Sequence, residues 1–333
     1  MANASFSPRD FRAWIIKEAT PGTSPTLTSG MHQLDVDSVS MPSLNVNQVL
    51  DVRSRIGRIF DSADFFQDNK HRSVEVSLSG TFHNDAGHRQ LLQSACSQTL
   101  STSAADVNLA FSTTGNSGEY GVTQNDVTFS LVLASPDVTD GYNFVMDGCM
   151  VTNFSITADM ATDGGMYKWS ATISSGQVPA LTNGDTMHAD TKYTGSPIAL
   201  STLGTIKVAN LTSPVLSSMG VTIDSPAVYT GTSSTGYKAF SRGPEIAVTC
   251  NAQVKYDALT RPLFNTFDGQ TTSAITSNFF TMTQGTATDC SITIGCGVIT
   301  NAALSEGDIM MVDFEGKAAV TGSLTNVIQF DLA

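Results

Sequence analysis

The amino-acid sequence predicts a mainly β protein with a minor α component. We expect two related β-sandwich or β-barrel domains in tandem, each with one short α-helix. Three observations lead to this fold class: apolar residues alternate with polar ones, a strand-and-helix unit occurs twice, and the composition suits sheets. The chain is 41% hydrophobic but only 14% charged, where globular domains carry about 25% charged residues. Ser, Thr, Asn and Gly make up the difference, which is typical of sheet surfaces and turns.

The repeated unit first occurs at Lys70 to Leu92. Its apolar or small residues recur at every second position, as in a half-buried strand; they are Val74, Val76, Leu78, Gly80 and Phe82. Asp85 then predicts the N-cap of a short helix that carries Leu91 and Leu92.

The second copy lies at Arg242 to Phe264, 172 positions later (246 − 74) and without a gap. Its inward positions are Ile246, Val248, Cys250, Ala252 and Val254. Asp257, Ala258, Arg261 and Leu263 are identical to Asp85, Ala86, Arg89 and Leu91. Pro262 replaces Gln90, and proline costs about 3 kcal/mol inside a helix. We therefore expect the second helix to begin later, with Pro262 in its first turn.

A second pair of similar segments supports the duplication. Gly148 to Asn153 reads GCMVTN, and Gly295 to Asn301 reads GCGVITN. The spacing here is 147 (295 − 148), so the second copy is 25 residues shorter (172 − 147) between the helix and the late strands.

The length of 333 residues agrees with two domains of about 100–200 residues each. We assign residues 1–30 to an N-terminal arm, 31–195 to the first domain and 196–333 to the second. Within the arm, Trp14, Ile15 and Ile16 are expected to add one edge strand. Few apolar residues occur from Pro179 to Pro197, which is interpreted as the connector between the domains.

The first domain contains a long segment, residues 49–69, between two expected strands. It combines three arginines with five large apolar residues: Arg53, Arg55 and Arg58, and Ile56, Ile59, Phe60, Phe65 and Phe66. Loops of this length are usually functional or disordered, and the apolar side chains require something to cover them. The second copy has only the short Thr230 to Gly236 at this place.

Composition excludes several functions. The net charge of −13 disfavours binding of nucleic acid in a basic groove. The five cysteines are scattered and form no CxxC pair, so we expect buried thiols in a reducing cytoplasm and neither a zinc ribbon nor a disulfide scaffold. The N-terminus lacks the apolar core of a signal peptide, and no stretch approaches the about 18 apolar residues of a membrane span.

Three groups of residues were weighed as chemical sites. His83, Asp85 and His88 are either a metal cluster or a capped helix start, and only the Asp has a counterpart in the second copy. Asp35 and Asp37 are either a glycosidase-type pair of carboxylates about 6–7 Å apart or simply the exposed residues of an alternating strand. Asp159 and Asp163 lack any calcium-loop pattern. No motif of an enzyme is present, so we assign no catalytic, cofactor-binding or metal-binding residue.

The N-terminal arm, the VEVSLSG strand with its capped helix, and the late strands introduced by a Gly-Cys-x-Val turn resemble the major tail tube protein of long-tailed (siphovirus-like) bacteriophages. The resemblance implies tail-tube-type domains whose sheets join edge to edge in hexameric rings. Such rings stack into a hollow tube through which the genome is ejected. Members with two tube domains in one chain form trimers that make pseudo-hexameric rings.

The resemblance also implies partners and contact residues. The chain would bind itself, the tail terminator and the tail tip or baseplate proteins, with the tape measure protein inside the lumen. Genomic DNA would pass without specific binding, no membrane would be involved, and the protein would reach the virion tail after assembly in the host cytoplasm. The candidates for contacts between subunits or rings are Trp14, Ile15, Ile16, Arg53, Arg55, Ile56, Arg58, Ile59, Phe60, Phe65 and Phe66.

A structural, non-enzymatic role is the interpretation adopted, with a lumen wall expected to be neutral or negative. The alternative is a two-domain β-sandwich adhesin or capsid decoration protein. That function requires aromatic residues clustered on loops, whereas Trp14 and Trp169 lie on expected strands.

Overall fold

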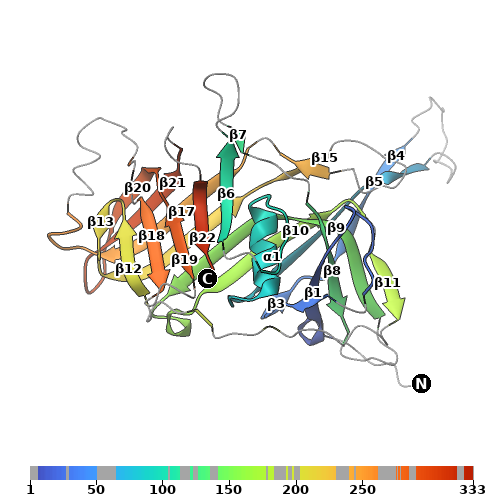
Figure 1. Ribbon diagram of the computed structural model, residues 1–333, viewed down its shortest axis with the longest axis horizontal. Helices are drawn as coiled ribbons and strands as arrows, with labels where there is room; N and C mark the ends of the chain where they lie inside the picture. Colours follow the sequence, from blue (N-terminus) through green and yellow to red (C-terminus); the bar gives the residue numbers. More distant parts are fainter. Residues whose placement is uncertain are drawn as a thin grey trace, which may run out of the picture.

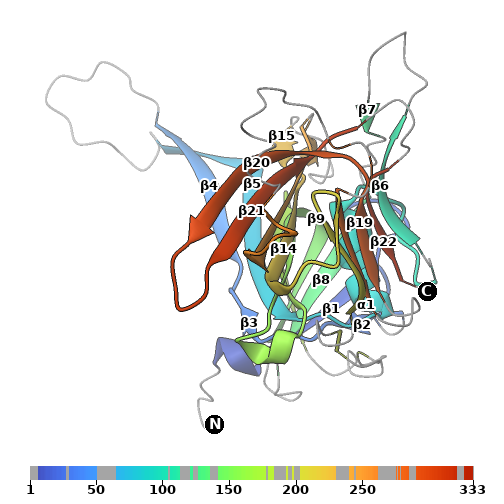
Figure 2. The same ribbon diagram turned by 90° about the vertical axis from the view of Figure 1, so that its left-hand side faces the viewer.

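The structure is a computed structural model (Figures 1 and 2). It describes residues 7–332 except 28–29, 51–64, 104–105, 113–120, 123–126, 136–141, 178, 184–192, 194–196, 199–202, 230–239, 244, 262–274, 276, 278, 285–289 and 321–325. Nearly all regular structure in these residues is β, which confirms the predicted fold class.

In the first half of the chain, the described residues form eleven strands and the α-helix α1 (Ala86–Ala95). The strands are β1 (Arg12–Lys17), β2 (His32–Gln33), β3 (Ser38–Val39), β4 (Ser43–Leu50), β5 (Phe65–Thr81), β6 (Asp106–Ser112), β7 (Gly121–Val122), β8 (Phe129–Ala134), β9 (Tyr142–Asp159), β10 (Lys168–Ser175) and β11 (Ala180–Asn183). Short 3-10 helices lie at Pro8–Asp10 and Asp163–Gly165.

The second half contributes eleven more strands. They are β12 (Leu203–Val208), β13 (Leu211–Thr212), β14 (Leu216–Asp224), β15 (Ala227–Tyr229), β16 (Phe240–Arg242), β17 (Ala247–Lys255), β18 (Phe280–Gln284), β19 (Ser291–Ile294), β20 (Gly297–Ser305), β21 (Met311–Ala318) and β22 (Asn326–Asp331).

These strands form two layers that enclose the core, seen side by side in Figure 2. One layer has the strand order β5-β10-β9-β14-β17-β21-β20, with β3 and β4 paired to the outer edge of β5. The other layer combines β2-β1-β8-β9-β11 with the sheet β13-β12-β18-β19-β22-β6-β7. Helix α1 lies between these two parts of the second layer (Figure 1). We call the first of the two layers the long layer.

Strand β9 belongs to both layers because it bends at Gly148, which has a φ of +67°. Residues of β9 up to Cys149 pair with β8 and β11, and residues from Met150 onward pair with β10 and β14. In the second half the same corner separates β19 from β20, at Gly295 and Cys296. The repeated Gly-Cys motif therefore marks the place where the chain passes from one layer to the other.

The two halves contribute the same strand order to the long layer. The first half supplies β3/β4-β5-β10-β9, and the second supplies β14-β17-β21-β20. The predicted alternation is confirmed in both central strands: Val74, Val76 and Leu78 of β5 are buried, as are the even-numbered residues 248 to 254 of β17. In register, Gly80 lies opposite Trp169, and its repeat equivalent Ala252 lies opposite Phe314.

The halves are fused through both layers. Strand β9 of the first half pairs with β14 of the second, and β22 of the second half pairs with β6 of the first. One hydrophobic cluster runs through both halves, from Ala13 to Leu332. The domain boundary after residue 195 stays a prediction.

The first predicted helix is confirmed. Asp85 is its N-cap and accepts a hydrogen bond from the His88 N–H at 3.0 Å, and Leu91 and Leu92 are fully buried. In the second copy Asp257 likewise accepts the Thr260 N–H at 3.1 Å, but only a turn follows as far as Arg261. The helix expected around Pro262 lies outside the described residues, and α1 is the one α-helix within them.

Three boundary expectations need correction. Strand β1 is not an edge strand, because it pairs with β2 on one side and β8 on the other. The segment 49–69 is not loop at its ends, because Val49 and Leu50 pair with Phe66 and Phe65 as the strands of a hairpin. The connector expected from Pro179 to Pro197 begins with strand β11.

All five cysteines are buried thiols, as predicted, and none of them forms a disulfide. Burial raises the pKa of the Cys96 and Cys250 thiols to about 12, which keeps them protonated. No helix within the described ranges has the length and hydrophobicity needed to cross a membrane.

Candidate functional site

The features of the fold that most require a partner are the two outer edges of the long layer. At one end lies β20, and at the other lie β3 and β4. Among the described residues, the outer edge of β20 has one isolated bridge, between Gly297 and Ile275, and β3 and β4 pair only with β5. An open sheet edge presents unpaired backbone groups that can template pairing with another chain.

The joint between β9 and β14 shows how such an edge is closed within the chain. The two strands pair antiparallel over seven residues, with Ile156 opposite Val221 and Thr157 opposite Gly220. The apolar side chains on the inner face, among them Phe154, Ile156 and Ile223, are buried beneath the joint.

The two open edges correspond to the two strands of that joint. In strand order β20 takes the place of β9, and β3/β4 take the place of β14. The pairing of strands at equivalent places in the two halves shows which residue of each open edge corresponds to which residue of the β9–β14 joint. Gly220 faces Asn251 as Ser38 faces Ser79, and Asn251 is the equivalent of Ser79 (79 + 172).

The same procedure matches Thr157 to Ala303. In the first half, Thr157 of β9 lies opposite Lys168 of β10, and Lys168 lies opposite Thr81 of β5. The repeat equivalent of Thr81 is Gln253 of β17 (81 + 172). In the second half, Gln253 lies opposite Asp313 of β21, and Asp313 lies opposite Ala303 of β20. The internal pair Gly220–Thr157 thus has its counterpart in Ser38 and Ala303, which lie on opposite edges of the layer and are both exposed.

Exposure distinguishes β20 from β9. In β9 the inner-face residues Phe154, Ile156 and Ala158 are buried, whereas Leu304 of β20, the counterpart of Ala158, is exposed. The large Ile156 of β9 faces Trp169, while the corresponding residue of β20, opposite Phe314, is the small Ala302. This edge was missed in the sequence, although the smaller side chains of 302–303 were a usable signal.

A buried guanidinium ties the second half to the first beside the joint. Arg242 at the end of β16 donates hydrogen bonds to the carbonyl oxygens of Val151, Ser225 (2.8 Å) and Ser94 (2.6 Å). Ser94 lies in the last turn of α1, where a cation also offsets the negative end of the helix dipole. Arg242 therefore connects β16 to α1 and β9.

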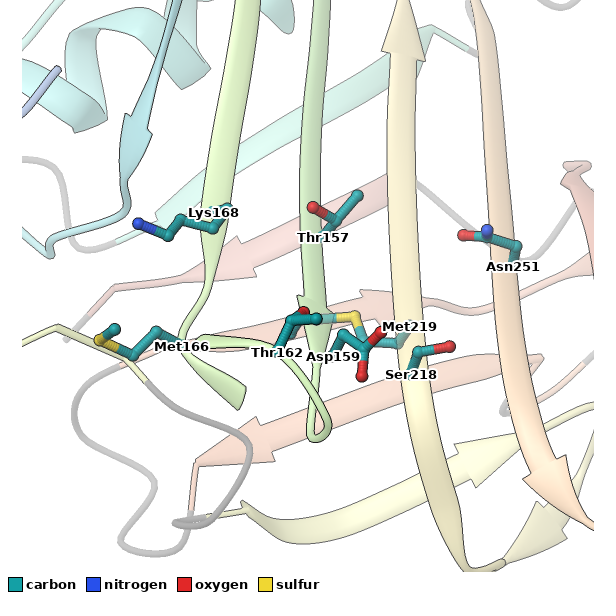
Figure 3. Close-up of a pocket in the computed structure, with 9 residues that line it drawn as sticks. Thr157, Asp159, Thr162, Met166, Lys168, Ser218, Met219 and Asn251 are labelled. Atoms are coloured by element: carbon teal, nitrogen blue, oxygen red, sulfur yellow. The ribbon is translucent and has the colours of Figure 1, made fainter. Parts of the chain in front are cut away.

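An open hollow of about 300 Å³ lies where β9, β10, β14 and β17 run side by side (Figure 3). Its walls are mainly polar and come from Thr157, Asp159, Lys168, Ser218 and Asn251. The ammonium of Lys168 is held at 2.9 Å by both Asp37 and Thr81. The hollow is therefore lined as a hydrophilic surface, with Ser218 opposite Asp159 across the β9–β14 joint.

The outward face of the long layer is hydrophilic over its whole width. Hydroxyl and amide side chains predominate on it, including Ser77, Ser170, Thr222, Thr249 and Asn251. Its charged residues on β5, β10, β9, β14, β17 and β21 are Glu75, Asp159, Asp224, Asp313 and Glu315 against Lys168, Lys255 and Lys317, which gives −2 (3 − 5) for the described side chains.

The contact residues predicted from the sequence fall into two groups. Trp14, Ile15 and Ile16 are 0–6% exposed and pack inside the subunit, with Trp14 and Ile16 against Met31 and Val132. Phe65 and Phe66 lie on β5 in the hairpin with β4. Arg53, Arg55, Ile56, Arg58, Ile59 and Phe60 lie outside the described residues. A role of all eleven in assembly stays a prediction.

The groups weighed as chemical sites have structural partners. His88 Nδ1 lies 2.9 Å from the cap carboxylate of Asp85, and His83 Nε2 lies 2.8 Å from Asp35. Asp159 accepts the Ala161 N–H at 2.7 Å in the turn after β9. Across the ranges that the structure describes, no three His, Cys, Asp or Glu residues come together in a way that could hold a metal ion.

One buried carboxylate stands out near the bend of β9. Glu18 accepts hydrogen bonds from the N–H groups of Gly22 (2.5 Å) and Gly148 (2.7 Å) and from the hydroxyls of Thr128 (2.5 Å) and Ser130 (2.9 Å). Burial raises its pKa above the usual value, although the four hydrogen bonds oppose the shift. This carboxylate anchors the segment after β1 to the corner between the layers.

A family model described as phage tail tube protein matches residues 10–318. No curated protein matches the chain.

Proposed function

Since the chain belongs to the phage tail tube protein family, we propose that three copies close into a ring of six tube units. In this proposal the rings stack into the tube of a long-tailed, siphovirus-like tail, through which the genome is ejected. The single observation that carries the ring is the β9–β14 joint. It closes an edge inside the chain and leaves the two equivalent edges open at the ends of the same layer.

We propose that β20 of one chain pairs with β3 and β4 of the next in the register of the internal joint. Closing a sheet in this way removes its open edges. The contact is heterologous, because two different edges meet, and such a contact gives a ring when the rotation closes. Three internal joints and three joints between chains would then alternate around the ring.

The test is a cross-link between the two edges. Ser38→Cys and Ala303→Cys are introduced together, because residues directly opposite on antiparallel strands have Cβ atoms about 4.5–5.5 Å apart. The five native cysteines are buried, so mild oxidation should act on the new pair. We expect covalent dimers and trimers on denaturing gels and no larger species, together with threefold rings in electron micrographs.

Two results would contradict the ring. One is a ladder that continues past three chains, which indicates an open polymer or a ring of another size. The other is the absence of cross-links in a protein that still forms rings, which indicates a different edge or register. Each single cysteine variant is the control and should give at most dimers.

We propose that the hydrophilic outer face of the long layer lines the lumen. Its hydroxyl and amide side chains and slight negative charge would let DNA pass without specific binding, since each Lys or Arg contact with a phosphate adds affinity. The family supports a virion tail component. We propose further that the tube is assembled in the host cytoplasm, that a tail terminator and tail tip or baseplate proteins bind its ends, and that the tape measure protein fills its lumen.

A further inference from the structure

An arginine of helix α1 reaches across the boundary between the two halves in the second layer. Arg89 donates a hydrogen bond to the carbonyl oxygen of Leu332, just beyond the end of β22, at 2.8 Å. Its Nε and Nη2 atoms also donate to Asn84 Oδ1 at 3.0 and 2.8 Å, which holds the guanidinium in this direction. The contact therefore ties the capped helix of the first half to the last strand of the second half.

Arg261 holds the same position in the second half. It is the repeat equivalent of Arg89 (89 + 172). Its backbone N–H donates to Asp257 O at 3.0 Å, as the Arg89 N–H donates to Asp85 O at 3.0 Å, so the backbone places both arginines alike relative to the capping aspartate. The environments of the two side chains differ, because Arg89 is half-buried whereas Arg261 is exposed.

Strand β11 of the first half is the counterpart of β22. The strand order β8-β9-β11 in the first half corresponds to β18-β19-β22 in the second. In the chain, β11 follows β10 and β22 follows β21, and β10 and β21 hold equivalent places in the long layer. Strand β22 pairs with β6 on its other side, whereas β11 pairs only with β9 among the described residues.

Exposure shows the same difference between these two strands. Leu181 of β11 lies opposite Phe144, which packs against the main hydrophobic cluster. Because residues directly opposite each other on paired strands share a face, Leu181 is on the core-facing side. It is nevertheless 59% exposed, whereas Ile328 and Phe330 of β22 are 0% and 1% exposed. Strand β11 thus lacks the cover that the first half gives to β22.

The exposed arginine and the uncovered strand belong to different halves of the molecule. Strand β11 lies on the far side of α1 from β17 (Figure 1), and Arg261 follows the end of β17 by six residues (261 − 255). In the ring described above, the second half of one chain meets the first half of the next. That arrangement brings Arg261 of one chain toward β11 of its neighbour, just as the chain itself brings Arg89 to β22.

We propose that Arg261 of one chain binds the C-terminal end of β11 in the next chain, so that the occupant of this uncovered side is a second copy of the same chain. The guanidinium donates to a backbone carbonyl oxygen between Leu181 and Asn183, and the aliphatic part of the arginine covers the Leu181 side chain. This inference rests on the proposed function. It adds a second contact between chains, in the second layer, to the pairing of β20 with β3 and β4.

The first test removes the guanidinium. Arg261→Met should raise the subunit concentration needed for half-maximal ring formation about tenfold or more, measured by mass photometry, because a hydrogen bond from a charged donor is lost at each joint between chains. The free energy of unfolding of unpolymerised subunits should not change, since Arg261 is exposed there.

Lys255→Met is the matched control for this variant. It removes one positive charge from an exposed side chain near Arg261, but on the outward face of the long layer. Ring formation should need the same subunit concentration as in the unchanged protein. An equal loss of ring formation in Lys255→Met would overturn the proposal, because net charge and not a contact of Arg261 would then be responsible.

The second test exchanges charges between the two partners. Arg261→Glu should weaken ring formation, and so should Leu181→Arg, which sets two guanidinium groups against each other. Both substitutions in one chain should restore rings, because the glutamate of one chain then meets the arginine of the next. A double variant that forms rings no better than Arg261→Glu alone would overturn the proposal.

The remaining outcomes separate this inference from the proposed function. Rings of Arg261→Met at the concentration of the unchanged protein overturn the inference and leave the ring intact. Lower stability of the unpolymerised Arg261→Met subunit also overturns it, because the arginine would then act within its own chain. Failure of the unchanged protein to form rings would instead refute the proposed function.

Discussion

The two halves of the chain share a strand order but not the contacts that hold it. In the first half β9 is covered by β14, α1 lies between the two parts of the second layer, and Trp169 lies opposite Gly80. In the second half the equivalent β20 has an open edge, the capped segment is a turn as far as Arg261, and Phe314 faces Ala252. Strands β9 and β14 are thus completed within the chain, whereas β20 of the second half and β3/β4 of the first end in edges that require a neighbour.

This difference follows from the tandem arrangement. The joint between β9 and β14 forms within one molecule, where the link between the halves supplies a high effective concentration. The joint between chains has no such link and forms only when subunits meet. We therefore expect contacts in the first half and at the internal joint to dominate the free energy of unfolding of one subunit. The equivalent positions in the second half should matter less.

The largest decrease in the free energy of unfolding is expected from substitution of Arg242, which connects the halves. Arg242→Met removes hydrogen bonds to three carbonyl oxygens and leaves them buried. Such bonds to a charged group are each worth about 1.5–3 kcal/mol, so the free energy of unfolding should fall by about 3 kcal/mol or more. Urea denaturation of unpolymerised subunits measures it. The exposed Arg261→Met is the control and should change stability by less than about 0.5 kcal/mol.

A stability of Arg242→Met close to that of the unchanged protein would show that water replaces the guanidinium at no cost. The internal joint would then not depend on the hydrogen bonds of Arg242. The expected difference in stability between the joint within the chain and the joint between chains would be smaller.

The next largest effect on the free energy of unfolding is expected at Gly80, compared with its repeat equivalent Ala252. A Cβ atom at Gly80 would lie 1.9 Å from the carbonyl oxygen of Asp35, which is backbone and cannot turn aside. Gly80→Ala should therefore destabilise the subunit by about 2 kcal/mol, the range of overpacked cores. Ala252→Gly at the equivalent position should cost only about 0.5–1 kcal/mol.

Tryptophan fluorescence suits this measurement because both tryptophans lie in the first half, and Trp169 donates its indole N–H to Asp35 O and Thr81 O. Equal costs for the two variants would mean that the halves are packed alike, contrary to the comparison.

Sequence reasoning identified what is local. The alternation of Val74, Val76 and Leu78, the cap at Asp85 and the Gly-Cys corner all depend on a few neighbouring residues, and each is present in the structure. The β9–β14 joint is not local. It brings Ile156 and Val221 together, and nothing in either segment specifies the other as its partner.

Two misplaced boundaries have a similar cause. Strand β2, the second neighbour of β1, has only two residues, His32 and Gln33, and no apolar pattern that would predict it. The segment Phe65–Asn69 reads FFQDN and does not alternate, yet backbone pairing with β4 extends strand β5 that far. Candidate contacts at Trp14–Ile16 were chosen for being apolar, and apolar residues serve a subunit's own core as readily as an interface.

A smaller effect is expected from the two capping aspartates. Asp85→Ala removes the helix cap and the hydrogen bond to His88 Nδ1, at a buried site, and should cost about 1–2 kcal/mol. Asp257→Ala also removes a cap, from a half-buried turn, and should cost less, about 0.5 kcal/mol. Thermal unfolding followed by circular dichroism compares them. A larger loss for Asp257→Ala would reverse the order of the halves.

The smallest effect is a pH dependence at Glu18, the buried carboxylate beside Gly148. Burial raises its folded-state pKa above the usual 4.5, so between these two values the folded protein binds more protons than the unfolded chain. Stability therefore decreases as pH rises from 4.5 through the raised pKa and then levels off. Glu18→Gln cannot titrate, and the difference in unfolding free energy, unchanged protein minus variant, should fall over this interval. A difference that rises with pH would show that the four donated hydrogen bonds outweigh burial, and that this corner of the first half is stabilised by the charge it holds.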